Sequence, residues 1–431
     1  MSAADLKTKS SAAIQACASD LYDLSQEIWK NPELAFKERY AHRVLTDFLE
    51  NRGFRVDRHY KLETAFRAVC GEEGGLHVCV ICEYDALPGI GHGCGHNLIA
   101  EVGVAAGIAI KAAIQDFKQP VKLTVMGTPA EEAGGGKNFL IQDGCFKDVD
   151  FAMMAHPFTY NVSRWREILQ TCNSTVITPR KSDPRKGWTR ELLFNHYFVC
   201  LCRHSLEVTY KGKASHPAYQ TWEGTNALDA AVLCYSNISV LRQQMKPHHQ
   251  VHGIIENGGT HPDVIPSETK LTFYLRAHTE TELTNLEKRV VGCVESAAMA
   301  TGCQVEYNFK RDASKYSNLM QNNTLATLYE RNAEVLGVTN CSDESVTGAI
   351  SGSTDMGNVT HVVPGIHPMF ALPTDASIHS RHFTEEAGTL EAQPYALNQA
   401  RALAMTAVDV ICQSQLMDTI REEFKQDLAN D

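Results

Sequence analysis

The sequence predicts an α/β protein in which a mixed, largely parallel sheet lies between helices and a smaller ferredoxin-like α+β unit is inserted. In residues 1–157, short apolar runs typical of strands alternate with helical stretches, which favours a parallel sheet. Residues 206–309 have the order strand-helix-strand-strand-helix-strand, which is the order of a split βαβ unit. At 431 residues, the chain is also long for a single core.

The first part of the chain supplies most elements of the predicted sheet. Residues 12–29 and 40–52 have the periodicity of amphipathic helices, and residues 54–70 alternate like a hairpin of edge strands. Residues 77–83 form a short apolar run typical of a buried strand. We expect a helix over 98–114 and strands over 121–126 and 151–154 to follow.

The inserted unit and the tail continue the pattern. We expect strands over 206–210, 251–256, 268–277 and 303–309, and helices over 224–242 and 280–300. The tail has helical stretches at 325–336 and 391–412 and resembles strand at 362–371. Because the first sheet otherwise lacks strands, we expect the tail to return to it. The predicted domains are a main domain over 1–157 and 313–431, an anomalous insertion over 158–205, and a lid or dimerisation domain over 206–312.

Residues 158–205 do not fit their surroundings. This stretch contains Trp165, Trp188 and several arginines, and neither a helical nor a strand period persists through it. A loop of this length is unusual inside a compact domain. We therefore expect a poorly ordered insertion, and the composition favours a retained intron or an error in the gene model over a genuine splice variant.

The charge and composition of the chain argue against some classes of binding partner. The net charge of −11 argues against nucleic acid or an anionic membrane as the main partner. Residues 1–10 are polar, so no secretory signal is expected, and no apolar run is long enough to predict a membrane span. The 14 cysteines follow no framework spacing. Reduced cysteines in the cytoplasm, with the nucleus as an alternative, are the expected state.

Side chains that bind metals follow three of the predicted strands. Cys94 and His96 stand in a glycine-rich loop after one strand, Glu131 and Glu132 follow the next, and His156 follows the third. Each group alone has an ordinary explanation: a Cys-x-His pair that binds nothing, a solvated pair of carboxylates, a capped histidine. Open α/β sheets bind ligands beyond the carboxyl ends of their strands. Three such groups at neighbouring strand ends therefore predict a metal site.

These motifs resemble the family of co-catalytic zinc aminoacylases, carboxypeptidases and dipeptidases, and in particular its amidohydrolase branch. The resemblance covers nearly the whole chain apart from residues 158–205. The segments that carry it are Asp85-Ala86-Leu87-Pro88, Cys94-Gly95-His96, Pro129-Ala130-Glu131-Glu132, His156, Gly212-Lys213-Ala214-Ser215-His216 and Val264-Ile265-Pro266.

The resemblance implies a centre of two divalent metal ions, of which zinc is expected and manganese is the alternative. The implied ligands are Cys94, which bridges the ions, His96, Glu132, His156 and His379. His382 is the alternative to His379 as the last ligand. Glu131 is then the general base, which takes a proton from water and returns it to the leaving amine. Asp85 would orient a histidine ligand.

Further residues are implied in substrate binding. His216 would stabilise the oxyanion from across a dimer or upon domain closure, and Arg276 would anchor a substrate carboxylate. Asp263 stands where the family usually has asparagine, which weakens the case for a hydrogen bond to a carboxylate from this position. Gly352 and Ser353 are further candidates for the substrate pocket. A homodimer through the inserted domain is the expected assembly.

By this resemblance, the expected activity is hydrolysis of dipeptides with a C-terminal basic residue, such as β-alanyl-lysine. One alternative is an N-acyl-amino-acid amidohydrolase that acts on compounds such as hippurate. Another is a non-catalytic paralogue that serves as a binding module. Such paralogues usually lose ligands or the base, whereas this chain retains the five ligands and Glu131. A structural zinc site is disfavoured because its ligands would stand within one short segment.

Overall fold

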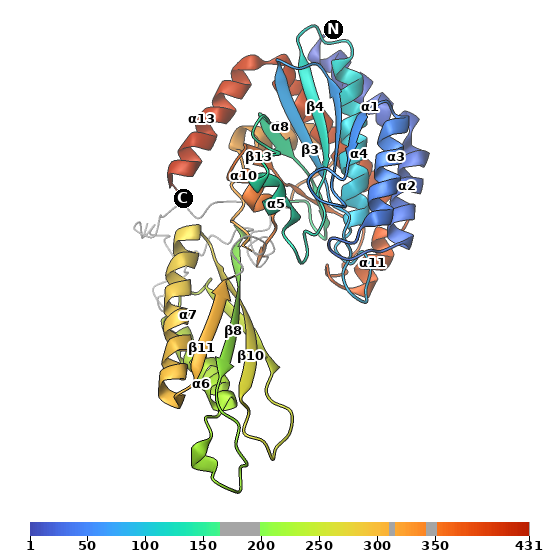
Figure 1. Ribbon diagram of the computed structural model, residues 1–431. Helices are drawn as coiled ribbons and strands as arrows, with labels where there is room; N and C mark the ends of the chain where they lie inside the picture. Colours follow the sequence, from blue (N-terminus) through green and yellow to red (C-terminus); the bar gives the residue numbers. More distant parts are fainter. Residues whose placement is uncertain (164–198, 310–314, 342–350, 431) are drawn as a thin grey trace, which may run out of the picture.

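The computed structural model describes residues 1–163, 199–309, 315–341 and 351–430, and these form a larger unit and an inserted unit (Figure 1). The larger unit contains both ends of the chain. The inserted unit projects from it at the lower end in the view of Figure 1.

The larger unit is built around a six-stranded sheet with the order β1-β2-β4-β3-β5-β13. β4, β3, β5 and β13 run parallel, whereas β1 and β2 pair antiparallel at one side. The prediction of a mixed, largely parallel sheet is therefore confirmed. The strands are β1 (Arg55–Arg58), β2 (Phe66–Gly71), β3 (Leu76–Cys82), β4 (Val121–Gly127), β5 (Phe151–Met153) and β13 (Gly365–Ile366).

Helices cover this sheet on both faces, and α4 is the most deeply buried of them. By length and composition α4 is apolar enough to cross a membrane, but 83% of its most apolar window is buried inside the fold, as expected of a core helix. The helices of the larger unit are α1 (Ala3–Ala16), α2 (Ala18–Lys30), α3 (Arg39–Asn51), α4 (His96–Ile114), α5 (Gly136–Gln142), α8 (Asn323–Val335), α10 (Met356–Thr360), α11 (Arg381–Ala387), α12 (Gln393–Cys412) and α13 (Ser414–Asn430).

The N-terminal helix differs from its prediction. The single helix expected over 12–29 is wrong, because the chain forms α1 and α2, which meet at Cys17 with φ of −123°. α1 begins at Ala3 because Ser2 and Asp5 form a capping box that satisfies free backbone N–H groups. The two helices are too closely spaced for periodicity alone to separate them.

The inserted unit has the ferredoxin-like topology that the order of elements predicts. Its four strands are all antiparallel and have the order β11-β8-β10-β9. α6 and α7 pack on one face of this sheet, where they share a separate hydrophobic core. The elements are β8 (Cys202–Lys211), η1 (Thr221–Glu223), α6 (Ala227–Leu241), η2 (Arg242–Gln244), β9 (Gln250–Asn257), β10 (Glu268–Ala277), α7 (Glu280–Thr301) and β11 (Gln304–Phe309).

Both ends of the predicted insertion over 158–205 contain strands of the fold. β6 (His156–Phe158) pairs with β14 (Met369–Ala371), and β7 (Val199–Cys200) pairs with β12 (Ser351–Gly352). β8 begins at Cys202 rather than at residue 206, and it pairs with β10 along its whole length. The sequence pattern does not predict this start, because Arg203 and His204 are polar. The remainder of the predicted insertion, residues 164–198, lies outside the described residues.

The tail returns to the larger unit, as predicted. β13 extends the sheet beside β5, and α12 packs against α4 and α8. The inserted unit is therefore joined to the rest of the protein by two chain segments, one on each side.

Two glycines in helices provide a test of this packing. A Cβ atom on Gly103 of α4 would lie 2.4 Å from Cys82 Sγ, whereas a Cβ atom on Gly292 of α7 would meet nothing within 4 Å. Gly103→Ala should lower the free energy of unfolding by about 1–3 kcal/mol through overpacking. Gly292→Ala should raise it by up to about 1 kcal/mol through helix propensity. Calorimetry of the two variants measures both changes, and a Gly103→Ala protein as stable as wild type would contradict this packing.

Candidate metal centre

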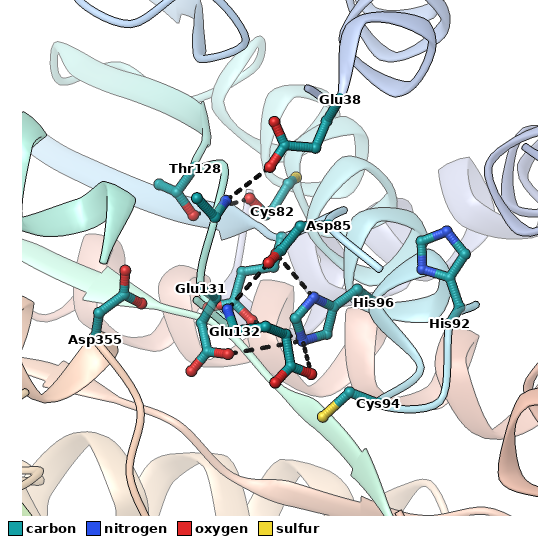
Figure 2. Close-up of polar contacts among 12 residues, drawn as sticks. Glu38, Cys82, Asp85, His92, Cys94, His96, Thr128, Glu131, Glu132 and Asp355 are labelled. Carbon is teal, nitrogen blue, oxygen red and sulfur yellow. Dashed lines mark hydrogen bonds and ion pairs between the residues drawn. The ribbon is translucent and has the colours of Figure 1, made fainter. Parts of the chain in front are cut away.

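Polar side chains meet at one edge of the main sheet. β4, β3 and β5 are neighbouring parallel strands, so their carboxyl ends lie side by side. This edge carries Cys94 and His96 after β3, Glu131 and Glu132 after β4, and His156 after β5. Figure 2 shows His96, Glu131 and Glu132 turned toward one another, with Cys94 below them in the view. The structure thus brings together side chains that the sequence predicts at three strand ends.

A glycine allows the Cys94 loop to approach the strand that carries His156. Gly95 has φ of 75°, in the left-handed region, and it precedes the first residue of α4. A Cβ atom at this position would lie 2.5 Å from Cγ of Pro157. Both the backbone conformation and the close contact therefore require glycine between Cys94 and His96.

One group of possible ligands consists of Cys94, His96 and His156. Their ligand atoms all lie within 4.8 Å of one another. Cys94 Sγ is 3.3 Å from His156 Nε2, and the rings of His96 and His156 are almost perpendicular at 89°. All three residues are buried. A thiolate and two imidazoles are a donor set that suits zinc.

A second group consists of Cys94, Glu132 and His379, whose ligand atoms also lie within 4.8 Å of one another. His379 Nε2 is 3.4 Å from Glu132 Oε1, and the backbone N–H of His379 donates a hydrogen bond to the Gly93 carbonyl. His382 instead lies 3.4 Å from Glu386 on its own helix. Of the two predicted alternatives, His379 is therefore the one placed with the other candidate ligands.

The two groups fit a pair of divalent cations that share Cys94. His96 Nε2 and Glu132 Oε1 are buried and have no hydrogen-bond partner, although buried polar atoms normally have one. The pKa of the Cys94 thiol is held well above its usual range, mainly by burial and further by the charges of Glu132 and Glu131. Nearby positive charge would favour the thiolate that metal binding requires.

Asp85 orients both groups. Its Oδ1 atom accepts a hydrogen bond from His96 Nδ1 at 3.1 Å, and its Oδ2 atom accepts one from the backbone N–H of Glu132 at 3.0 Å. The first bond leaves Nε2 of His96 to face the other ligands. Burial lowers the pKa of His96, but the hydrogen bond to Asp85 and the surrounding carboxylates outweigh it and raise the pKa to about 10. A divalent cation would take the place of that proton at Nε2.

Glu131 lies beside these ligands without belonging to either group. Its Oε2 atom is 4.0 Å from His96 Nε2. The pKa of its carboxyl group is held well above the usual range, mainly by burial and further by the charges of Glu83 and Glu132. In contrast, Glu132 has a pKa of about 2, because contacts with His379 and His96 outweigh the effect of burial. The two adjacent carboxyl groups therefore differ strongly in proton affinity, which suits different tasks.

Sequence reasoning missed a buried ion network behind this edge. Lys137 Nζ lies 2.5 Å from Asp355 Oδ1 and also pairs with Glu83, and all three side chains are fully buried. Glu83 Oε2 in turn lies 3.8 Å from His96 Nε2. The position of Glu83 directly after β3 could have drawn attention to it. Lys137 and Asp355 are 218 residues apart, and nothing in the local sequence links them.

Other predicted site residues lie away from the metal ligands. His216 is exposed in the loop after β8, and Asp263 is exposed between β9 and β10. Arg276 is the second-last residue of β10 and stands opposite Arg203 of β8. Gly352 pairs with Cys200, next to the half-buried Ser353. In the described part of the chain, no hydrogen bond or ion pair joins these residues to the two ligand groups.

A further cluster, in the inserted unit, consists of His248, His278 and Glu282, with ligand atoms within 4.8 Å of one another. The rings of His248 and His278 are stacked, with centroids 3.6 Å apart and planes at 11°. Their lone pairs therefore do not converge on one point. Glu282 is already paired with Lys246 and with His248. These contacts describe a neutralised surface cluster rather than a formed metal site.

Comparison with known proteins identifies similar chains. Residues 79–388 match the model of peptidase family M20/M25/M40. The chain is 44% identical to the Xaa-Arg dipeptidase of Homo sapiens, over 99% of this chain and 93% of that protein. It is 45% identical to the Xaa-Arg dipeptidase of Mus musculus, over 97% of this chain and 92% of that protein.

A solved structure has the same fold. It is the Bacillus subtilis YXEP protein, described as a dinuclear metal-binding peptidase of the M20 family. The two structures superpose with a TM-score of 0.62 over 92% of this chain and 99% of that one, at 18% sequence identity.

The choice between His379 and His382 can be tested by metal content. His379→Ala removes one of the three donors of the second group, so the metal bound per chain should fall from about two ions to about one. His382→Ala is the matched control, because both side chains are about half exposed and only His379 faces Glu132. Elemental analysis after gel filtration measures the ratio. Loss of an ion from His382→Ala with retention in His379→Ala would reverse the assignment.

Proposed function

The chain belongs to peptidase family M20/M25/M40 and is a metal-dependent dipeptidase, and we propose that it cleaves dipeptides whose C-terminal residue is basic. Two relatives that are 44–45% identical over nearly the full chain are Xaa-Arg dipeptidases, which supports arginine as the C-terminal residue. Lysine and ornithine carry a similar charge on a shorter or differently shaped side chain, so dipeptides such as β-alanyl-lysine belong to the same class.

One observation supports the chemistry most directly: two ligand groups share Cys94, and Glu131 lies beside them. Two divalent ions held there would polarise the scissile carbonyl and lower the pKa of a water molecule. Cys94, His96 and His156 would hold one ion, and Cys94, Glu132 and His379 the other. We propose zinc for both positions, because the donor set contains a thiolate and imidazoles, and manganese as the alternative.

Glu131 is the proposed general base and acid. It accepts a proton from the attacking water and then donates that proton to the leaving amine. Burial and nearby carboxylates raise its proton affinity, which suits a group that must hold a proton between the two steps. Glu132 stays ionised as a ligand, and Asp85 keeps His96 and the backbone of Glu132 in place.

The inserted unit is proposed to complete the site. His216 is exposed in the loop after β8, and we propose that it reaches a substrate carbonyl oxygen when the units close or when a second subunit supplies it. The outer strand of this unit, β9, leaves Ile254 63% exposed at an unpaired sheet edge. An exposed apolar strand edge is suited to pairing with another copy of the chain. We therefore propose a homodimer formed through the inserted unit.

Two arginines support recognition of the C-terminal carboxylate. Arg276 and Arg203 are opposite each other on β10 and β8, near the junction of the two units. Among the described residues, no carboxylate pairs with either guanidinium group, and Nε of Arg203 is buried without a hydrogen-bond partner. Two adjacent like charges are suited to bind an anion through forked hydrogen bonds. Arg276 is the proposed anchor, with Asp263, Gly352 and Ser353 as further proposed contacts of the substrate.

We also propose the cytoplasm, with the nucleus as an alternative, as the location of this activity. Every cysteine in the described part of the chain is free, and Cys94 has to be a thiolate to bind metal. A reducing compartment keeps such thiols available.

Release of free amino acid from a panel of substrates tests the function. The metal-loaded protein should cleave β-alanyl-lysine and Xaa-Arg dipeptides faster than dipeptides with an uncharged C-terminal residue. A chelator should abolish the activity and added zinc or manganese should restore it. Preferential cleavage of hippurate would favour an N-acyl-amino-acid amidohydrolase, and no cleavage of any compound would favour a binding module.

The role of Glu131 has its own test. Glu131→Gln should lower kcat on the best dipeptide by about 10²–10⁴-fold, because general acid–base catalysis contributes that much. Bound metal should not change, since Glu131 is not a proposed ligand. Glu73→Gln on the surface is the control and should keep full activity. A Glu131→Gln enzyme with wild-type kcat would contradict this assignment.

A further inference from the structure

The backbone around Glu131 is held by side chains at three of its polar groups. The N–H of Ala130 donates to Glu38 Oε1 at 2.9 Å, and the N–H of Glu132 donates to Asp85 Oδ2 at 3.0 Å. Between them, the carbonyl of Glu131 accepts a hydrogen bond from the hydroxyl of Tyr316. Figure 2 shows Glu38 above Asp85, each joined to this loop by a dashed line. The peptide group that links Glu131 to Glu132 is therefore fixed at both its oxygen and its nitrogen.

This loop needs such support because its conformation is unfavourable. Ala130 has φ of 62°, in the left-handed region that residues with a Cβ atom rarely adopt. A backbone of this kind persists only where its surroundings determine it. If one of the three bonds is lost, the loop can relax at that point. Loss of the bond to the Glu131 carbonyl would release Glu131, while the bond from the Glu132 N–H to Asp85 would still hold the ligand Glu132.

Tyr316 differs from the other two partners in its position in the chain. Glu38 stands at the start of α3 and Asp85 follows β3, so both belong to the larger unit. Tyr316 belongs to the segment that returns from the inserted unit to α8. Its backbone N–H and carbonyl pair with those of Arg203, at the start of β8, at 2.8 Å and 2.7 Å. Tyr316 thus lies where the two segments that join the units pair with each other.

The side chain of Tyr316 is enclosed on both sides of this junction. It is 1% exposed, and the guanidinium group of Arg203 lies 3.9 Å from the centre of its ring. The ring thus spans from a strand of the inserted unit to the loop that carries Glu131. A rotation of the inserted unit about its two connections would move this ring, and the ring's hydroxyl group would carry the movement to the Glu131 carbonyl.

We propose that Tyr316 is a positioning residue that sets the direction of the Glu131 carboxyl group and links it to the connection with the inserted unit. The inference rests on the proposed function only in taking Glu131 as the general base. Through this hydrogen bond, the base would be correctly placed when the two connecting segments have the arrangement seen here.

Tyr316→Phe removes the hydroxyl group and keeps the ring against Arg203. In the metal-loaded enzyme, kcat should fall by about 10–100-fold, since small displacements of reacting groups have effects of this size. KM should change less than about twofold, and the metal content should stay at the wild-type value, because no ligand or substrate contact is removed. Incorporation of p-aminophenylalanine at position 316, which restores a donor, should recover most of kcat.

Tyr329→Phe is the matched control. Tyr329 is also buried at 2% exposure, and its hydroxyl group donates to Gln399 in the core between α8 and α12. The Tyr329→Phe enzyme should lose thermal stability to a similar extent as the Tyr316→Phe enzyme, and its kcat should stay at the wild-type value. Equal kcat values for the two variants would overturn the proposal, since they would show a purely structural role.

Crystal structures of both variants with metal separate this proposal from the proposed function. The carboxyl group of Glu131 should be displaced in Tyr316→Phe and unchanged in Tyr329→Phe. An undisplaced Glu131 in Tyr316→Phe would overturn the positioning role. If the wild-type protein cleaves no dipeptide, the proposed function fails, and the position of Glu131 in these two structures still decides for or against the role of Tyr316.

Discussion

The site depends on an electrostatic constraint at one edge of the main sheet. The ends of parallel strands bring together the buried side chains of Glu83, Asp85, Glu131 and Cys94 and the half-buried Glu132. Ionised groups taken out of water are costly unless opposite charge accompanies them. Lys137 pairs with both Glu83 and Asp355 behind the ligands, but its single positive charge offsets only one of the two carboxylates, and the thiol and Glu131 have strongly raised pKa values. A pair of divalent cations would supply the missing positive charge, and burial lowers the pKa of His156 to about 4, which favours the neutral ring that binds a metal.

The fold turns that constraint into a defined geometry. Parallel strands place their carboxyl ends together, Gly95 lets the Cys94 loop approach Pro157, and Asp85 orients one ligand through its side chain and another through its backbone. Each ligand is thus attached to a regular element or held by a second group. The inserted unit has a separate core and joins this framework through two segments.

Much of the site could be predicted because its residues directly follow apolar strands. Cys94, His96, Glu131, Glu132 and His156 all stand in short segments whose local pattern shows where each strand ends. The ferredoxin-like topology also follows from the order of the elements. The Lys137–Asp355 pair could not be predicted, because a buried lysine has no local signal and its partner is 218 residues away. The start of β8 was missed for another reason: Arg203 and His204 are polar residues that tertiary contacts bury in part or in full.

The central claim is that two cations share the thiolate of Cys94. Anomalous diffraction from crystals of the metal-loaded protein tests it most directly. The account predicts two anomalous peaks, each within about 2.3 Å of Cys94 Sγ as expected for zinc–sulfur bonds, one beside His96 and His156 and the other beside Glu132 and His379. A single peak, or two peaks of which one lies away from Sγ, would contradict it.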